Sequence, residues 1–171
     1  MNLSIKSNWA QAIWTCKPFN ELTPLELYLI LQLRSAVFVV EQHCAFQDLD
    51  DKDQPSYHLM GSLDGGLIAY TRIVPAGISY SESSIGRVVT SPAARKAGIG
   101  KELMERSIQT LFHLYGPGPI RIGAQRYLQG FYESLGFRQT SDMYLEDGIE
   151  HIEMLRDYPR GNNSNNWNLS Q

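Results

Sequence analysis

The alternation of apolar and polar residues divides the chain into strands and helices. Apolar residues recur at helical spacing between about 25 and 40, behind Thr23, Pro24 and Glu26. Those three residues predict a helix start with a capping box and a proline in the first turn. The spacing predicts a buried helix face made of Leu25, Tyr28, Leu29, Leu33, Ala36, Val37 and Val40.

Strands are predicted before this helix and again well after it. Residues 9–16 alternate loosely, and residues 57–63 and 67–74 flank the turn sequence DGG at 64–66, which is typical of a hairpin. A further strand at 84–90 ends before a proline, which cannot continue a strand ladder. The polar stretch between the first helix and the hairpin, 41–56, is expected to be a loop.

The second half of the chain continues the alternation. A long helix runs to about Tyr115, and the sequence GPGP at 116–119 breaks it. Its expected core face consists of Met104, Ile108, Leu111, Phe112 and Tyr115. A strand at 120–125 and a short helix closed by Gly136 follow; the helix is marked by Leu128, Phe131, Tyr132 and Leu135.

Two last strands at 137–145 and 149–155 are joined by a turn at 146–148. This order of elements predicts an α/β (α+β) fold around one sheet. With 171 residues, the chain has the size of one domain. We expect a flexible N-terminus at 1–8, the domain at 9–157, and a disordered tail at 158–171, where apolar residues are few.

Composition narrows the range of functions. The net charge is −3, and the pI is near 5.8, so there is no global basic field that would favour nucleic acid or an anionic membrane as partner. Neither a signal peptide nor an apolar run long enough for a membrane span is visible, and the cytoplasm is the expected compartment. Two cysteines, Cys16 and Cys44, form neither a disulfide framework nor a zinc motif, and we expect no metal.

A glycine-containing turn between the strand at 84–90 and the long helix is the most informative segment. The amides at a helix start lack intrahelical partners and attract anions, and glycines allow a phosphate to approach the backbone. Gly98 and Gly100 lie there, with Arg95, Lys96 and Lys101 as added positive charge. The segment fails both the P-loop and the dinucleotide-binding patterns. By itself it is equally compatible with a tight connection that binds nothing.

Two motifs in this order resemble the GNAT superfamily of N-acetyltransferases. Residues 95–100 (RKAGIG) match the acetyl-CoA motif [RQ]-x-x-G-x-[GA], and residues 129–137 (QGFYESLGF) resemble the family's second signature. A narrower resemblance to the ElaA-type subgroup includes 34–44 (RSAVFVVEQHC), 85–89 (IGRVV), 123–125 (GAQ) and 146–151 (EDGIEH), and the likeness spans about residues 9–157. It implies a mixed, mostly antiparallel sheet that is splayed at an acetyl-CoA cleft, with helices on both faces.

The resemblance also implies roles for individual residues. The main chain of Val88, Val89 and Thr90 would lie beside the pantetheine and the acetyl carbonyl, and the N–H of Val89 would polarise that carbonyl. The phosphates and pantetheine would be bound by Arg95, Lys96, Ala97, Gly98, Ile99, Gly100, Lys101 and Gln125. Tyr132 would also touch the cosubstrate and donate a proton to the leaving sulfur. From spacing alone, Tyr132 is an ordinary core aromatic and Gln125 a solvated strand end.

The acceptor side is less determined. The first helix and the following loop shape it in this family, which makes Arg34, Glu41 and His58 candidates for substrate contacts. Candidates for the general base are Glu41, His58, Glu82, Glu150 and His151. A structural role for either histidine and a water chain in place of one base are open alternatives. The run Asp48, Asp50, Asp51 and Asp53 lacks the spacing of a calcium loop and is expected to be solvated.

The implied activity is transfer of the acetyl group of acetyl-CoA to a primary amine of a small molecule or peptide, by direct attack in a ternary complex. The main alternative is a non-catalytic acyl-CoA-binding or regulatory module on the same fold. A nucleotide-binding protein is disfavoured because both nucleotide motifs fail. Since many relatives dimerise, a homodimer is one expectation from the resemblance, although no residue indicates it.

Overall fold

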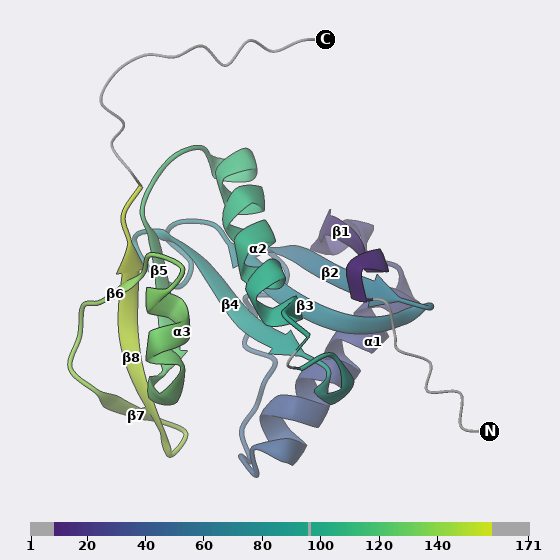
Figure 1. The fold of residues 1–171 in the computed structure, drawn as a ribbon, viewed down its shortest axis with the longest axis horizontal. Helices are drawn as coiled ribbons and strands as arrows, with labels where there is room; N and C mark the ends of the chain where they lie inside the picture. The colour runs from purple at the N-terminus through teal and green to yellow at the C-terminus, as the bar shows by residue number, and fades with distance from the viewer. Residues whose placement is uncertain (1–8, 96, 159–171) are drawn as a thin grey trace, which may run out of the picture.

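The computed structural model describes residues 9–95 and 97–158, which form one open sheet of eight strands (Figure 1). The strands are β1 (Ile13–Pro18), β2 (Tyr57–Leu63), β3 (Gly66–Val74), β4 (Ser83–Thr90), β5 (Ile120–Gln125), β6 (Arg138–Gln139), β7 (Tyr144–Glu146) and β8 (Ile149–Arg156). Their order is β1-β2-β3-β4-β5-β8-β6, and β7 also pairs with β8. The mixed, mostly antiparallel sheet expected from the resemblance is confirmed.

Helices cover both faces of the sheet. They are α1 (Pro24–Arg34), which continues as a π-helical segment (Ser35–Glu41), α2 (Ile99–Tyr115) and α3 (Gln129–Glu133). In Figure 1, α2 and α3 lie in front of the sheet, and α1 lies behind β3 and β4. Single 3₁₀ turns occupy Trp9–Gln11, Phe19–Glu21, Pro92–Ala94 and Arg126–Leu128. Among the described residues, no helix is long and apolar enough to cross a bilayer.

The sheet divides between β4 and β5, its one parallel pair. These strands are paired only at Ser83 with Ile120 and at Ser84 with Arg121. Beyond those residues both strands run on in the same direction without further pairing, β4 to Thr90 and β5 to Gln125. The splay expected from the resemblance is therefore present, and it leaves main-chain groups of β4 facing open space.

The core lies on both sides of the sheet. The larger cluster packs α2 and α3 on the sheet through Ile99, Leu103, Met104, Ile108 and Leu111 of α2. The face expected for this helix is confirmed except at Tyr115, which is 37% exposed. A smaller cluster beneath α1 contains Ile30, Leu33, Val37, Met60, Tyr70 and Val89.

The start of α1 is as predicted, but its buried face is only partly as predicted. The Thr23 hydroxyl accepts the Glu26 N–H (3.2 Å), and the Glu26 carboxylate accepts the Thr23 N–H (2.8 Å). Leu33 and Val37 are buried as predicted, together with Ile30 and Arg34, whereas Ala36 is exposed. Leu25, Tyr28 and Val40 are exposed by 65%, 63% and 66%, so their assignment to the core was wrong. The π-helical segment rotates the later positions, because its i→i+5 bonds change the helical period, and a buried arginine does not register in an apolar pattern.

The loop at 41–56 is not the solvated segment that its polarity suggested. Asp48 and Asp53 are only 6% and 7% exposed. Arg34, itself fully buried, pairs with both at 2.8 Å, and Arg72 pairs with Asp53 at 2.9 Å. Arg72 also pairs with Asp50 at 2.6 Å, and Arg87 pairs with Asp48 at 2.7 Å. We call these three arginines and three aspartates the Arg–Asp network; it fastens the loop to α1, β3 and β4.

Asp53→Asn should destabilise the protein by about 3 kcal/mol, because removing one charge of a buried pair leaves its partner uncompensated. Two guanidiniums, those of Arg34 and Arg72, lose a partner at once. Urea unfolding measures the effect. Asp142→Asn, at an exposed position, is the control. A loss of stability equal to that of the control would contradict a structural role for the network.

The same network should make stability depend on acid. Burial alone would raise the pKa of Asp53, but the charges and hydrogen bonds of Arg34 and Arg72 outweigh it and lower that pKa. A carboxyl with a lowered folded-state pKa stabilises the fold above its unfolded pKa, about 3.9, and loses that contribution as the pH falls further. The melting temperature should therefore fall below about pH 4, and less steeply in Asp53→Asn.

The strand boundaries at the two ends differ from expectation. β1 begins only at Ile13, because Trp9–Gln11 forms a 3₁₀ turn. The strand expected at 137–145 is split into β6 and β7, since the Ser141 hydroxyl takes the Glu153 N–H (2.8 Å) that a continuous strand would bond through its main chain. Tyr158 is described and packs edge-on against Phe112 at 5.1 Å. The expectations for 1–8 and 159–171 concern residues outside the described ranges.

Candidate functional site

A cleft of about 800 Å³ occupies the gap where β4 and β5 diverge. Its walls come from the end of the π-helical segment and the following loop, from β4, from the turn before α2, from β5 and α3, and from the β7–β8 hairpin. The cleft is therefore lined by elements from both faces of the sheet. Its volume is in the range of sites for small molecules and cofactors.

The turn before α2 forms one end of the cleft. Gly98 has a φ of +81° and caps the helix from the left-handed region, which favours glycine. A Cβ added at Gly98 or at Gly100 would meet no atom within 4 Å, so the approach to the first helical turn is open. The N–H groups of Lys101 and Glu102 both donate to the Gly98 carbonyl oxygen, at 3.1 Å. The amides before them lie at the positive end of the helix, which attracts anions. Ile99 is buried beneath them, while Ala97 and Lys101 are exposed; Lys96 lies outside the described residues.

Arg95 of this turn is paired with Glu41. The guanidinium donates two hydrogen bonds, of 2.7 and 2.9 Å, to the two carboxylate oxygens. The hydrogen bond from Arg95 lowers the pKa of Glu41 and keeps it ionised. Both residues line the cleft, but both oxygens of Glu41 already have a partner. The structure thus places Glu41 beside the turn before α2, with both of its oxygens already bonded to Arg95.

The edge of β4 runs along the cleft. Arg87 has a φ of +52°, and the pairing with β3 shifts register opposite it, so the strand bulges just before Val88. The Val89 side chain is buried under α1, so Val89 can act in the cleft through its main chain alone. Arg87 is held at the bulge by Asp48 and by Asp50 (3.3 Å). The Arg–Asp network therefore fixes the strand edge that precedes Val88, Val89 and Thr90.

Tyr132 of α3 is both a core residue and a wall of the cleft. Its ring contacts Phe131 and Phe137 edge-on, at 5.1 and 6.0 Å between centroids, and the residue is 5% exposed. Burial raises the pKa of its phenol, which keeps the proton on the oxygen. Among the described residues no group hydrogen-bonds this hydroxyl. Tyr132 thus lines the cleft with a phenol that keeps its proton.

Gln125 reaches across the opening from the end of β5. Its side-chain amide donates to the Gln42 oxygen at 3.1 Å, which links β5 to the residue after the π-helical segment. Both side chains line the cleft. Cys44 is 8% exposed, and its thiol lies 3.4 Å from the Asp147 carbonyl oxygen.

The opposite side of β5 and β8 carries polar side chains. Because side chains alternate along a strand, the core positions Ala124 and Ile152 leave the paired residues Gln125 and His151 on the other face. His151 lines the cleft, with Nδ1 2.9 Å from the Ile149 carbonyl oxygen and Nε2 4.0 Å from Glu146. In a neutral ring, the nitrogen that bonds a carbonyl oxygen carries the proton, and Nε2 is then the acceptor.

Two tyrosines that the sequence analysis did not single out lie on this same face. A Cβ at Gly123 would be 3.0 Å from the Tyr80 hydroxyl and 3.3 Å from the Tyr144 hydroxyl. Tyr80 lines the cleft, and the Tyr144 ring stacks on His151 at 6.0 Å. The only sequence signal was the glycine itself, in the middle of a strand, where it often marks a close approach.

Several candidates are not at the cleft. Arg34 is fully buried in the Arg–Asp network, so its role as a substrate contact was wrong. His58 is fully buried between the Asp53 carbonyl (3.0 Å) and the Tyr70 hydroxyl (2.8 Å), and it reaches neither substrate nor solvent. A hydrogen bond from Arg121 lowers the pKa of Glu82 to about 2, and exposed Glu150 pairs with Arg126. The prediction of His58, Glu82 and Glu150 as candidate general bases was therefore wrong.

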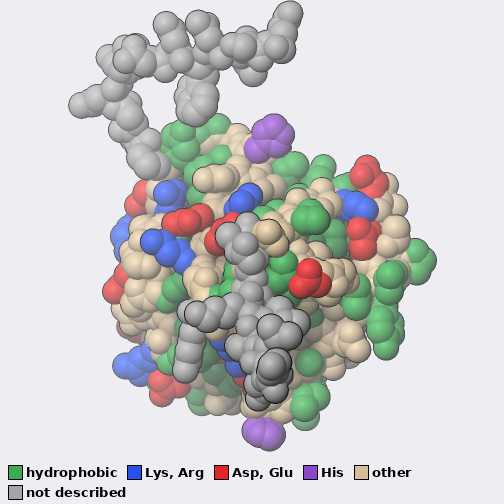
Figure 2. Space-filling model, turned by 45° about the vertical axis from the view of Figure 1, so that its right-hand side comes forward, with side chains coloured by type: hydrophobic (Ala, Val, Ile, Leu, Met, Phe, Trp, Pro, Cys, Tyr) green, Lys and Arg blue, Asp and Glu red, His purple; other side chains and the backbone are tan. Residues whose placement is uncertain are grey.

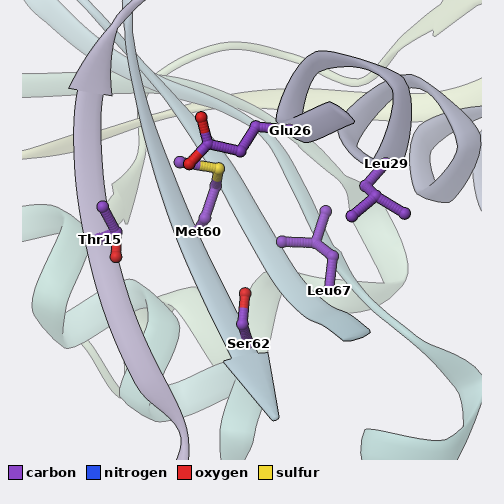
Figure 3. A pocket seen from close by; sticks show the side chains of 6 residues that line it. All are labelled: Thr15, Glu26, Leu29, Met60, Ser62 and Leu67. Carbon is purple, nitrogen blue, oxygen red and sulfur yellow. The ribbon is translucent and has the colours of Figure 1, made fainter. Parts of the chain in front are cut away.

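A second, small pocket of about 60 Å³ lies between α1 and the strands β1, β2 and β3 (Figure 3). Its lining residues are Thr15, Glu26, Leu29, Met60, Ser62 and Leu67. A volume of this size holds a few water molecules at most. On the visible face of Figure 2, acidic and basic side chains are interspersed, without a large patch of one sign. The cleft at the splay is therefore the candidate site.

Comparison with known proteins agrees with this geometry. Residues 36–157 match the family described as an acetyltransferase (GNAT) domain. Protein ElaA of Escherichia coli (strain K12) is 41% identical over 146 residues, which cover 84% of this chain and 95% of ElaA. A UPF0039 protein of Schizosaccharomyces pombe is 43% identical over 140 residues, covering 81% of this chain and 92% of that protein.

Solved structures give the same result. An acyl-CoA N-acyltransferase from Pseudomonas aeruginosa superposes with a TM-score of 0.81 at 45% identity, covering 85% of this chain and 99% of that one. The crystal structure of Escherichia coli ElaA also gives a TM-score of 0.81, at 40% identity and the same coverage. Together with the match over most of its length, this makes the chain a member of the GNAT acetyltransferase family, which transfers acyl groups from CoA, and of its ElaA-like group.

Proposed function

We propose that the protein transfers the acetyl group of acetyl-CoA to a primary amine of a small molecule or peptide, by direct attack in a ternary complex. The observation that carries this proposal is the cleft at the splay. It joins an open helix start at one end to the Tyr132 phenol and the exposed edge of β4. A thioester bound along that edge would lie within reach of both a proton donor and main-chain donors.

The described residues fit the cosubstrate. The pyrophosphate would bind the first-turn amides of α2, where nothing obstructs Gly98 and Gly100. Arg95 would add a charge there, exchanging part of its bond with Glu41 for a phosphate oxygen. The pantetheine would follow the edge of β4 at Val88–Thr90, and Gln125 could bond one of its amides from β5.

The chemistry then follows from the positions of these groups. The neutral amine attacks the thioester carbon, and the developing oxyanion is stabilised by main-chain N–H groups near Val89. The carbon–sulfur bond breaks as Tyr132 donates its proton to the sulfur, which leaves as the thiol. The ammonium formed in the attack gives its proton to a base. Freeing a lysine-like amine at neutral pH costs about 4–5 kcal/mol, so a nearby acceptor matters.

His151 is our candidate for that base. Of the candidate bases named from the sequence, only Glu41 and His151 line the cleft, and the Glu41 carboxylate is paired with the Arg95 guanidinium. The Nε2 atom of His151 has no such guanidinium partner among the described residues. It also lies on the sheet face opposite Tyr132, so an amine arriving from that side would stand between base and acid. A bridging water can relay the proton without altering this assignment.

The test combines binding and turnover. Calorimetry should give a dissociation constant for acetyl-CoA on the order of micromolar, about −8 kcal/mol, and no binding of ATP or NAD. A panel of amines is then screened for release of the CoA thiol, with His151→Gln as the variant expected to lower turnover but not acetyl-CoA affinity. Binding without thiol release for every amine would instead support a non-catalytic acyl-CoA-binding module. Failure to bind acetyl-CoA would refute both.

A further inference from the structure

We propose that the amine acceptor is a diamine or another amine that carries no carboxylate, and that it binds against the tyrosine-lined, acidic face of β5, β8 and β7. This inference rests on the proposed acylation of amines and specifies its substrate class.

The two faces of the splayed sheet differ in chemistry. Tyr132 and the helix-start amides belong to the face covered by α2 and α3. The other face of β5 and β8 presents Gln125, His151 and Glu153, with Gly123 between them. Because Tyr132 would approach the thioester from the first face, the amine acceptor would bind on the second face.

This second face carries excess negative charge. Arg121 lies between two carboxylates, Glu82 at 2.7 Å and Glu153 at 3.0 Å, so one positive charge stands against two negative charges. Among the described residues, Glu146, on the cleft wall, has only His151 as an ion-pair partner, at 4.0 Å. Glu153 and Glu146 both help to raise the pKa of Tyr80 to about 12, behind burial and Tyr144, which is what a local negative potential does.

Elsewhere around the cleft, the charged side chains of the described residues have partners or neighbours of opposite sign. The three arginines of the Arg–Asp network face three aspartates, and Arg95 faces Glu41. Lys52 and Asp147, which also line the cleft, carry opposite charges. The net attraction for a cation is therefore concentrated beside Tyr80, His151 and Glu146.

The shape of this face suits an ammonium on an aliphatic chain. The hydroxyls of Tyr80 and Tyr144 converge over Gly123 and can accept N–H bonds, while their rings flank the chain. A cation is also attracted to aromatic faces. A carboxylate at the same place would meet Glu146 and the Glu153 pair, and it would be repelled. The face therefore discriminates by charge as well as by size.

The decisive pair of substrates is 1,5-diaminopentane and lysine, which differ by one carboxylate. We expect kcat/KM for the diamine to be at least about tenfold higher at low ionic strength, with the ratio shrinking as salt screens the charges. Equal values, or a preference for lysine, would overturn the inference and leave the acylation of amines standing. Acetyl-CoA binding without thiol release from any amine would sink the proposed function instead.

A matched pair of variants locates the effect. Glu146→Gln should raise KM for the diamine about fivefold, leave KM for acetyl-CoA unchanged, and narrow the preference over lysine. Glu150→Gln is the control, because Glu150 is also about half exposed in the same hairpin, 53% against 57%, but does not line the cleft. Identical behaviour of the two variants would overturn the assignment of this face. If neither amine turns over, calorimetric titration of the diamine decides, since binding that Glu146→Gln leaves unchanged refutes the site.

Discussion

Gly100→Leu should weaken CoA binding on the order of a hundredfold or more, about 2.7 kcal/mol, while the protein remains folded. In the ligand-free structure, a side chain at Gly100 projects into open space, so nothing in the fold resists it. Gly100 is the second residue of α2, where leucine favours the helix over glycine by roughly 0.5–1 kcal/mol. The leucine would instead occupy the place of the pyrophosphate. Isothermal calorimetry with CoA measures the loss, and thermal unfolding should show an unchanged or raised melting temperature.

Gly118→Leu provides the control for this result. Gly118 also has open space around its Cβ position and no positive φ, and it lies after the far end of α2. Its variant should bind CoA as the parent protein does. If Gly100→Leu captured CoA with undiminished affinity, the helix start would not be the phosphate site, and the acetyltransferase proposal would lose its main support.

Tyr132→Phe should lower kcat about a hundredfold and leave acetyl-CoA affinity nearly unchanged. A positioned general acid contributes typically 10²–10⁴-fold, and only the phenolic oxygen is removed. The ring retains its contacts with Phe131 and Phe137, so the fold should be preserved. Steady-state thiol release gives kcat, and circular dichroism checks the fold.

The pH dependence of kcat distinguishes the general-acid role of Tyr132 from other roles. Burial raises the pKa of Tyr132, so the phenol stays protonated well above neutral pH, and an alkaline fall in kcat cannot come from its ionisation below pH 10. Tyr28→Phe, at an exposed tyrosine of α1, should keep full activity. Unchanged turnover in Tyr132→Phe would remove this residue from the mechanism.

Short-range patterns predicted what depends on neighbours in sequence. The capping box at Thr23, the hairpin of β2 and β3, and the glycine turn before α2 each lie within a few residues, and all appear in the structure. The resemblance added the splay of the sheet, which no local pattern contains. The placement of Tyr132 on the cleft wall is consistent with its implied role, whereas the role itself stays a prediction.

Contacts between residues far apart in the sequence could not be predicted from such patterns. Arg34 and Asp53 are nineteen residues apart, and each looks like a solvated charge until β3 supplies Arg72 to complete the network. The π-helical segment after Arg34 moved Val40 off the core by changing the helical period. Tyr80 became a cleft residue only because Gly123, on a distant strand, leaves room for its hydroxyl.

The Arg–Asp network also limits which substitutions the loop at 41–56 can accept where it borders the cleft. The loop that supplies Phe46, Asp50 and Lys52 to the cleft is anchored by the same carboxylates that neutralise three guanidiniums, of which those of Arg34 and Arg72 are buried. A loop grafted from a relative that lacks these aspartates would leave buried arginine side chains without a counter-charge. We therefore expect substrate specificity among relatives to change through substitutions at the uncharged positions of this loop, or through joint replacement of an aspartate and its arginine partner. A mutant library directed at the cleft should keep Asp48, Asp50 and Asp53 unchanged.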